Sequence, residues 1–410
     1  ILILIVLISL IAVFFSRFIV FRNFILILLF LNIGVSMFNL IPSISKFLKP
    51  GLQNTTKFEQ LSGITTSGNI KYPNIFYIIP DGLSSPQVLK NYADIDYKDS
   101  INKFEEKNFF VSKHIYSSYN LTYLSLAALF LMDYPITNKS EIYEDRSNFY
   151  PSLREYDPEI LRYLKKNNYQ FVIIPPAWGG CPKSKEYRCL KPFTDTFFSN
   201  FFQDYAVSKM FQHSLIKTFF DRYNNKYNIT RSDMNDAGKT ALDHMKVNSE
   251  HWIDGGVFTM IHMMIPHAPY RDKDCNIIDG YANQPKEGYK LSVYCAFKRI
   301  HELSDFIIKN YPNASIIVQA DHGIYLNKDD VNKGYQELSE SFVDSRMGIF
   351  TAVRGCNSDV ASKLNQANIV KNIVQCLVRG NTDENLLNKS FFGFYEKNPE
   401  FGKVYRVRKK

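Results

Sequence analysis

The chain has 410 residues, of which 45% are apolar, and its 49 Lys and Arg exceed its 40 Asp and Glu to give a formal charge of +9. Length alone favours two or three folding units, and the apolar content is sufficient for a sizeable core. The basic residues are spread among acidic ones and no dense basic-aromatic motif occurs, so we expect no nucleic-acid partner. A surface close to anionic lipid headgroups accounts for the excess charge.

Six cysteines are present, none of them in a CxxC pair, and no His/Cys cluster indicates a zinc finger. An even number of cysteines in an exported domain favours disulfides. Spacing suggests the pairs Cys181 with Cys189, Cys275 with Cys295, and Cys356 with Cys376. The alternative is six unpaired, buried thiols.

Two apolar runs make up most of residues 1–41, and a short segment with Arg17 and Arg22 separates them. We predict transmembrane helices here, followed by a polar linker over residues 42–72. Because residue 1 already lies inside an apolar run, we expect the natural chain to begin earlier. The two arginines place the segment between the spans in the cytoplasm, so everything after the second span lies outside it. We therefore expect a multi-pass protein of the cytoplasmic (inner) membrane; a cleaved signal peptide is the alternative for one run.

From residue 73 onward, strand-like and helix-like stretches alternate. The expected strands cover residues 74–79, 109–116, 169–174, 256–264, 314–320 and 347–353. The expected helices cover residues 100–108, 157–167, 236–252, 289–310 and 360–378, and one more begins near Thr122. Strands separated by helices favour an α/β domain with a mostly parallel central sheet flanked by helices. We predict that residues 73–410 form this domain on the extracytoplasmic or periplasmic side.

Two of the expected strands end in side chains that bind metals. The stretch NIFYIIPDG places Asp81 after one buried strand, and ASIIVQADHG places Asp321 and His322 after another. In open α/β sheets, ligands bind at the carboxyl ends of the strands. Two carboxylates and an imidazole suit zinc or manganese better than calcium or copper. We predict one divalent metal ion, zinc or manganese; the alternative for the Asp-His-Gly is a turn whose Asp caps a helix.

Thr122 stands near the start of an apolar helix in the stretch SSYNLTYLSLAALFLMDY. A threonine hydroxyl becomes a good nucleophile when a metal lowers its pKa, and helix N-terminal amides favour developing negative charge. We therefore expect Thr122 to contact the metal and to act as the nucleophile. Ser125, Ser117 and Ser118 are rival nucleophiles. Thr122 could instead be only the helix N-cap, and the local sequence by itself favours that alternative.

Three further residues are candidates for contact with a substrate. His267 lies in a Pro-His-Ala-Pro turn, where a ring can protonate a leaving oxygen or bind a phosphate. Trp178, in PPAWGG, follows an expected strand and could line a substrate pocket, although packing is an equal explanation. Arg346 is a candidate phosphate contact. His262, inside a strand-like run, is interpreted as structural.

With these residues identified, the chain resembles the alkaline phosphatase superfamily, and most of all its membrane-anchored, sulfatase-like branch of lipoteichoic acid synthases and phosphoethanolamine transferases. The matching stretches are NIFYIIPDG, SYNLTYLSLAALFLMDY, IHMMIPHAPY and IIVQADHG, in that order. The resemblance implies that Asp81, Asp321 and His322 are metal ligands and Thr122 the nucleophile. It also implies that His267 contacts the transferred phosphate group.

Differences from that family limit which reaction and how many metal ions we expect. No C/S-x-P-x-R motif of true sulfatases occurs, which disfavours sulfate ester hydrolysis. Two-metal phosphodiesterases of the superfamily carry an Asp where this chain has Met263, and a later His where His322 is the last histidine. Both differences favour one catalytic metal. Asp81 stands where lipoteichoic acid synthases have Glu, so the subgroup stays open.

These observations predict a membrane-embedded, metal-dependent transferase. It moves a phospho-alcohol group, of phosphoethanolamine or phosphoglycerol type, from a membrane phospholipid donor to an envelope glycan or lipid acceptor through a phospho-threonine. The first alternative is a sulfatase-like hydrolase, that is a phosphatase, phosphodiesterase or sulfuric ester hydrolase. The second is a scaffolding protein that keeps the fold without catalysis.

Overall fold

The structure is a computed structural model. It describes residues 72–134, 158–175, 188–190, 236–247, 249, 252, 254–278, 285–324, 337–356, 358–380, 392–397 and 402–406. The chain divides into two units, Ile1–Gly68 and Asn69–Lys410, and every described residue belongs to the second. The predicted membrane spans therefore lie outside the described residues. Within the part that is described, no helix has the length and apolar character needed to cross a bilayer.

A seven-stranded sheet organises the domain, with strand order β2-β9-β7-β1-β6-β4-β5. Its strands are β1 (Ile75–Pro80), β2 (Phe110–Val111), β4 (Gln170–Ile174), β5 (Arg188–Cys189), β6 (Val257–Met263), β7 (Ser315–Gln319) and β9 (Thr351–Arg354). The five strands from β7 to β5 are parallel, while β9 and β2 are antiparallel to their neighbours. The mostly parallel sheet predicted from the sequence is confirmed, and β1 lies at its centre.

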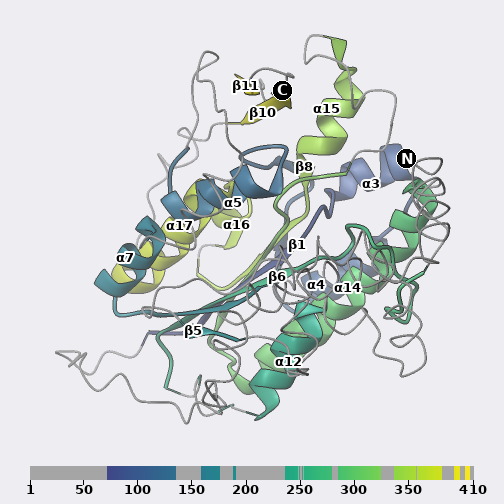
Figure 1. Ribbon diagram of the computed structural model, residues 1–410. Helices are drawn as coiled ribbons and strands as arrows, with labels where there is room; N and C mark the ends of the chain where they lie inside the picture. The colour runs from purple at the N-terminus through teal and green to yellow at the C-terminus, as the bar shows by residue number, and fades with distance from the viewer. Residues whose placement is uncertain are drawn as a thin grey trace, which may run out of the picture. The chain divides into compact units, whose positions relative to one another are not determined.

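Helices cover both faces of this sheet (Figure 1). One face carries α5 (Thr122–Leu131), α7 (Glu159–Lys166), α16 (Ser358–Ala361) and α17 (Gln366–Arg379). The other carries α4 (Lys98–Glu106), α12 (Ala237–Val247) and α14 (Pro285–Asn310). The remaining described helices, α3 (Pro86–Ala93) and α15 (Glu340–Met347), lie near the edge at which β1 ends (Figure 1).

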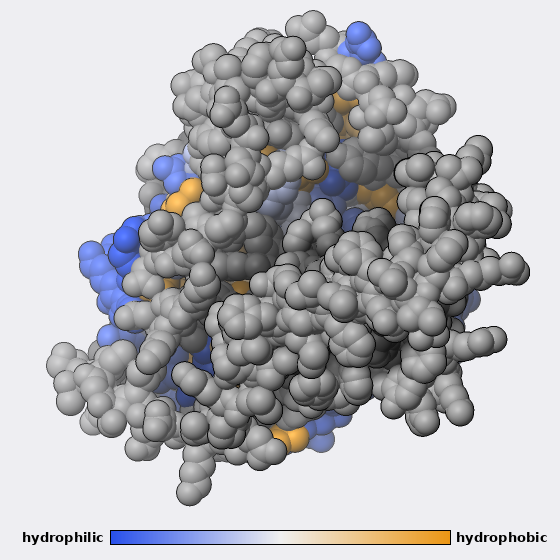
Figure 2. Space-filling view, viewed as in Figure 1, coloured by the Kyte–Doolittle hydropathy of each residue, from blue (hydrophilic) through white to orange (hydrophobic). Residues whose placement is uncertain are grey.

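Side-chain alternation along β1 explains the two covered faces. Ile75, Tyr77 and Ile79 pack into the core under α5, α7 and α17, while Phe76 and Ile78 pack into the core under α12 and α14. A strand buried on both sides reads as a continuous apolar run, as the sequence indicated. Helix α7 is amphipathic, and its outward side is hydrophilic in Figure 2.

One predicted strand is wrong in its extent. Residues 109–116 were expected to form a single strand, but β2 ends at Val111 and β3 (Ile115–Tyr116) belongs to a separate ladder with β8 (Gly348–Ile349). The expected strand 347–353 is divided at the same place into β8 and β9. β3 and β8, which are far apart in sequence, thus pair with each other outside the main sheet. The structure also has a hairpin of β10 (Gly393–Lys397) and β11 (Gly402–Arg406) that the sequence reading did not predict.

Disulfides hold two of the helices to neighbouring segments. Cys275 is bonded to Cys295 of α14, with 5.1 Å between their Cα atoms, and Cys356 to Cys376 of α17, with 5.9 Å. Both pairs confirm the predictions from spacing. Cys189 is disulfide-bonded too, and its expected partner Cys181 lies outside the described residues. Such bonds persist in oxidising compartments, which supports placing the domain outside the cytoplasm.

His301 of α14 generates a prediction about stability. Its ring packs against Phe104 with 4.5 Å between centroids, and neither ring nitrogen has a hydrogen-bond partner among the described residues. Burial, with Lys107 and Lys103 nearby, lowers the pKa of His301 to about 4. The unfolded chain binds this proton near pH 6.5 and the folded chain does not, so stability falls as pH decreases from about 6.5 to about 4.

We expect the His301→Phe variant to lose this part of the pH dependence, because phenylalanine fills the same aromatic site and does not titrate. Thermal midpoints measured from pH 4.5 to 7.5 should converge at neutral pH and separate in acid, with the variant the more stable. Parallel curves for variant and wild type would contradict the prediction.

Candidate metal centre

Asp81 follows the central strand and is held at its carboxyl end. Its backbone N–H donates to the carbonyl of Met263 at 2.8 Å, which continues the pairing of β1 with β6. The next residue, Gly82, adopts a φ of +76°, a conformation that favours glycine, so the chain turns sharply here. Tyr289 of α14 donates its hydroxyl to the Gly82 carbonyl at 2.9 Å and fixes the turn. A strand end and a braced turn thus position the Asp81 carboxylate.

The second arm of the site follows β7 and is held by close backbone packing. Gly323 donates its N–H to the carbonyl of Arg346 at 2.7 Å. A Cβ atom on Gly323 would overlap the carbonyl of Ser345 and lie 2.9 Å from that of Gly348. Only glycine allows this approach, which explains the glycine in the Asp-His-Gly motif and fixes His322 just before it.

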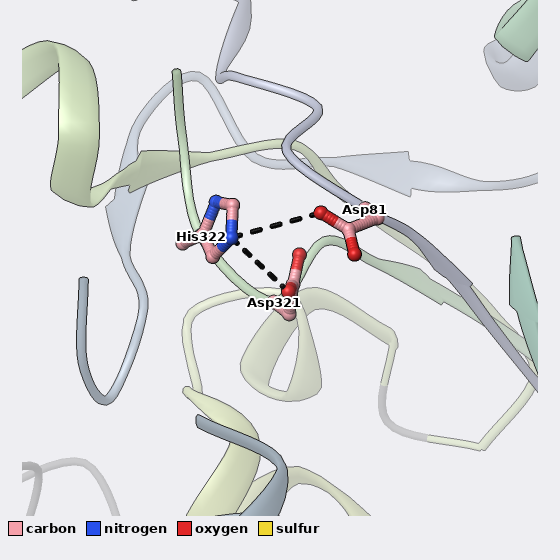
Figure 3. Close-up of side chains that lie close together, drawn as sticks. All are labelled: Asp81, Asp321 and His322. Atoms are coloured by element: carbon pink, nitrogen blue, oxygen red, sulfur yellow. Dashed lines mark ion pairs between the residues drawn. The ribbon is translucent and has the colours of Figure 1, made fainter. Parts of the chain in front are cut away.

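Asp81, Asp321 and His322 form a buried cluster in which one atom from each lies within 4.8 Å of the others (Figure 3). His322 Nε2 lies 3.6 Å from Asp81 Oδ1 and 3.4 Å from Asp321 Oδ2. These same two oxygens have no hydrogen-bond partner among the described residues. The other oxygen of each carboxylate is engaged, since Gly82 N–H donates to Asp321 Oδ1 at 3.0 Å and His262 Nε2 lies 3.4 Å from Asp81 Oδ2.

The cluster fits a divalent cation. Metal–ligand bonds of about 2.0–2.2 Å in a tetrahedral arrangement put ligand atoms roughly 3.3–3.6 Å apart, and the separations from His322 Nε2 match that range. With both carboxylates ionised, the cluster carries two buried negative charges, which a protein interior tolerates only when they are paired or coordinate a metal. Two carboxylates and an imidazole suit zinc or manganese.

The ring of His322 is oriented for coordination. Its Nδ1 lies 2.8 Å from the carbonyl of Gly323. A carbonyl can only accept, so Nδ1 carries the proton and Nε2 directs its lone pair at the two carboxylates. Burial, with Arg346 nearby, lowers the pKa of His322 to about 4, which keeps the ring neutral at pH 7. Burial alone would raise the pKa of Asp81, but His262, His322 and His267 outweigh it and hold that pKa below its usual range.

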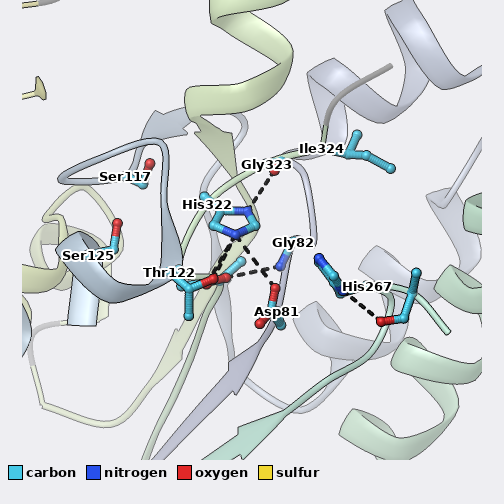
Figure 4. A network of polar contacts seen from close by, with 12 residues as sticks. Asp81, Gly82, Ser117, Thr122, Ser125, His267, His322, Gly323 and Ile324 are labelled. Atoms are coloured by element: carbon cyan, nitrogen blue, oxygen red, sulfur yellow. Dashed lines mark hydrogen bonds and ion pairs between the residues drawn. The ribbon is translucent and has the colours of Figure 1, made fainter. Parts of the chain in front are cut away.

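Thr122 lies beside this cluster (Figure 4). Its Oγ1 is 2.9 Å from His322 Nε2, although the two residues are 200 positions apart in sequence. The N-cap of α5 is Leu121 and Thr122 is the first helical residue, so the interpretation of Thr122 as an N-cap is wrong. Thr122 is half-buried, and its hydroxyl faces the cluster of Asp81, Asp321 and His322 instead of capping the helix.

The three rival serines are turned away from the cluster or buried elsewhere. Ser125 Oγ donates to the carbonyl of Tyr119 at 2.8 Å, and Ser117 Oγ donates to the same carbonyl at 2.6 Å. Ser118 is fully buried. In Figure 4, Ser117 and Ser125 lie on the far side of the loop from Asp81. Their hydroxyls bond within the loop that precedes α5, and Thr122 is the hydroxyl brought to the cluster of Asp81, Asp321 and His322.

The other predicted contacts fall in different places. His267 is exposed, and its backbone N–H donates to the backbone carbonyl of Asp81 at 3.1 Å. Its ring Nδ1 lies 2.7 Å from the carbonyl of Ala268, which leaves ring Nε2 able to contact a substrate. Arg346 is buried and donates to the Gly323 carbonyl at 2.6 Å, behind His322. Trp178 lies outside the described residues.

His262, which the sequence analysis interpreted as structural, lies beside the cluster. It lies in β6, is 1% exposed, and its Nε2 is near Asp81 Oδ2, whereas His322 is near the other oxygen, Oδ1. The signal available in the sequence was a histidine inside an otherwise apolar run, since a buried imidazole needs a polar neighbour.

Comparisons with known proteins add the following. No family model matches the chain, and a search of curated proteins found no match. The C-terminal periplasmic domain of phosphoethanolamine transferase EptC from Campylobacter jejuni is similar at 12% identity and a TM-score of 0.45, covering 74% of this chain and 89% of that one. The corresponding Escherichia coli EptC domain in complex with Zn has 11% identity and a TM-score of 0.47, covering 82% and 93%.

A protein in the alkaline phosphatase superfamily from Vibrio parahaemolyticus has 11% identity and a TM-score of 0.48, covering 79% of this chain and 73% of that one. The superfamily and the phosphoethanolamine transferases are the groups that the sequence motifs resemble.

Metal binding at the cluster is directly testable. We expect zinc or manganese to raise the thermal midpoint of the protein, since a ligand that binds only the folded state stabilises it by about 2.7 kcal/mol at 100 times its Kd. Asp321→Asn keeps the shape of the side chain but removes its charge, so the variant should lose both the rise in midpoint and the bound metal measured by mass spectrometry.

Asp274→Asn is the matched control, because the Asp274 side chain is 83% exposed and lies in a different loop. It should respond to metal as the wild type does. Equal metal responses of the wild type and Asp321→Asn would show that the cluster does not hold the ion.

Proposed function

We propose that the protein is a metal-dependent phosphotransferase that acts through a covalent phospho-threonine at Thr122. The observation that carries this proposal is the position of Thr122 Oγ1, 2.9 Å from His322 Nε2. Two buried carboxylate oxygens converge on the same nitrogen, and neither has a hydrogen-bond partner in the part of the chain that the structure describes. A hydroxyl at such a point has the surroundings of an activated nucleophile rather than those of a packing residue.

Asp81, Asp321 and His322 would hold the metal, which when bound lowers the pKa of the Thr122 hydroxyl and polarises a phosphate oxygen. Thr122 is the first residue of α5, and the first backbone N–H groups of a helix have no partner within it. These amides and the helix dipole favour an anionic phosphate next to the nucleophile. The chain thus provides both a nucleophile and a place for the phosphate.

The proposed reaction has two displacements. In the first, Thr122 Oγ1 gives its proton to solvent and forms a bond to phosphorus, the bond from phosphorus to the lipid alcohol oxygen breaks, and His267 gives a proton to that leaving oxygen. In the second, an acceptor hydroxyl loses its proton to His267 and attacks phosphorus, which breaks the bond to Thr122, and the released Thr122 oxygen takes a proton back from solvent. His267 is exposed on the loop after β6, and its Nε2 can meet either oxygen.

The donor we propose is a membrane phospholipid with a phospho-alcohol headgroup, and the acceptor an envelope glycan or lipid. Two features support these partners. The apolar runs in residues 1–41 would keep the site at a membrane, and the disulfides Cys275–Cys295 and Cys356–Cys376 suit an extracytoplasmic compartment. We propose that the enzyme works on the outer side of the cytoplasmic membrane.

Hydrolysis is the second candidate, and the exposure of the site favours it. His267 is exposed and Thr122 is partly exposed, so water can approach both. The same phospho-Thr122 would then be resolved by water, and the protein would be a phosphatase or phosphodiesterase. The two candidates share the first displacement and differ only in the second.

Intact mass of the full chain, incubated with zinc and phospholipids of different headgroups, tests the proposal. We expect an adduct with the mass of one phospho-alcohol group, mapped to Thr122. Thr122→Ala should lose the adduct and turnover while keeping its metal, and Thr122→Ser should retain an adduct because it keeps the hydroxyl.

Adding a glycan or lipid acceptor then distinguishes the candidates: transfer to the acceptor identifies a transferase, and free phospho-alcohol identifies a hydrolase. Full turnover by Thr122→Ala would exclude the covalent mechanism.

A further inference from the structure

Gln366 makes three hydrogen bonds that join the two halves of the site. Its Nε2 donates to the carbonyl of Ala320 at 2.7 Å and to that of Asp321 at 3.3 Å. Its Oε1 accepts the backbone N–H of Ser118 at 2.6 Å. The residue is 2% exposed, so water does not compete for these contacts.

The three partners of this amide belong to two different parts of the proposed machinery. Ala320 and Asp321 directly follow β7, and Asp321 is one of the proposed metal ligands. Ser118 lies in the loop that leads into α5 and to the nucleophile Thr122, and it is 248 positions from Gln366 in sequence. A single planar side chain therefore fixes the spacing between the metal-binding strand end and the nucleophile loop.

The chemistry of the contact requires glutamine. Two carbonyls need a donor and one N–H needs an acceptor, and a side-chain amide supplies both at a fixed separation. Gln366 is the first residue of α17, and Ala367 beside it packs against Leu124 and Ala128 of α5. The helix that carries Gln366 is thus packed on the helix that carries the nucleophile.

We infer that Gln366 is a positioning residue that sets the distance between Thr122 Oγ1 and the metal ligands. This inference rests on the proposed function. A displacement of about 1 Å at a nucleophile can cost about a hundredfold in rate, so a bond remote from the chemistry can control it.

The test compares Gln366→Met with Gln319→Met. Gln319 is an equally buried glutamine on β7 that also makes three side-chain hydrogen bonds, to Tyr77, Thr351 and Leu364, none of which lies in the nucleophile loop. Replacing either glutamine removes buried hydrogen bonds and lowers stability. Only replacement of Gln366 removes the hydrogen bond that holds the backbone N–H of Ser118.

Three quantities are measured well below the thermal midpoint: hydrogen exchange of the peptide 117–122, bound zinc, and the rate of adduct formation on Thr122. We expect Gln366→Met to exchange this peptide at least about tenfold faster, to keep its zinc, and to form adduct about a hundredfold more slowly, with kcat lowered more than KM is changed. Gln319→Met should show none of these effects on the loop or on the adduct rate.

A wild-type exchange rate and adduct rate in Gln366→Met would overturn the inference, as would equal slowing by Gln319→Met. Should Gln366→Met fail to fold, Gln366→Glu replaces it, since it keeps the acceptor for Ser118 but loses the donor to β7. Adduct formation by Gln366→Glu at the wild-type rate would also overturn the inference. Absence of adduct in the wild type would instead refute the proposed function, and the exchange comparison would still test the anchoring of the loop.

Discussion

The structure depends on the convergence of two buried carboxylates on one imidazole nitrogen. Asp81 and Asp321 are both buried, and each has one oxygen engaged and one oxygen directed at His322 Nε2. Charges of one sign are costly in such a place unless a cation joins them. A cation bound between the two carboxylates would join the ends of β1 and β7 and would make this edge of the sheet a metal centre.

The parallel sheet supplies this geometry at little conformational cost. Strands β1 and β7 are neighbours and run in the same direction, so the residues that follow them emerge together at one edge. Close packing then removes the remaining freedom: Gly323 fits against the turn at Ser345, and Arg346 and His322 share the Gly323 carbonyl. These contacts position the three side chains that we propose as metal ligands, and such fixed positions are what the proposed catalytic centre requires.

The residues that the sequence revealed are those whose signal is local. An apolar run followed by Asp81, or by Asp321 and His322, contains in a few positions both the strand and the ligand at its end. Two disulfides were found in the same way, from spacing alone, and the parallel sheet followed from the alternation of strands and helices.

What the sequence could not show depends on contacts between distant segments. His262 meets Asp81 only because β6 pairs with β1, and Gln366 meets Ser118 only because α17 packs on α5. The split of the expected strand 109–116 has the same origin, since β3 finds its partner β8 more than 200 positions away. No local sequence pattern encodes such pairings between distant segments.

Crystals of the domain of residues 69–410, grown with zinc and measured above and below the zinc absorption edge, would locate the bound ion. We expect one strong anomalous peak bounded by Asp81 Oδ1, Asp321 Oδ2 and His322 Nε2, with Thr122 Oγ1 beside it. Zinc bound elsewhere in the domain, or no ion at these three side chains at saturating zinc, would show that they do not form a metal centre.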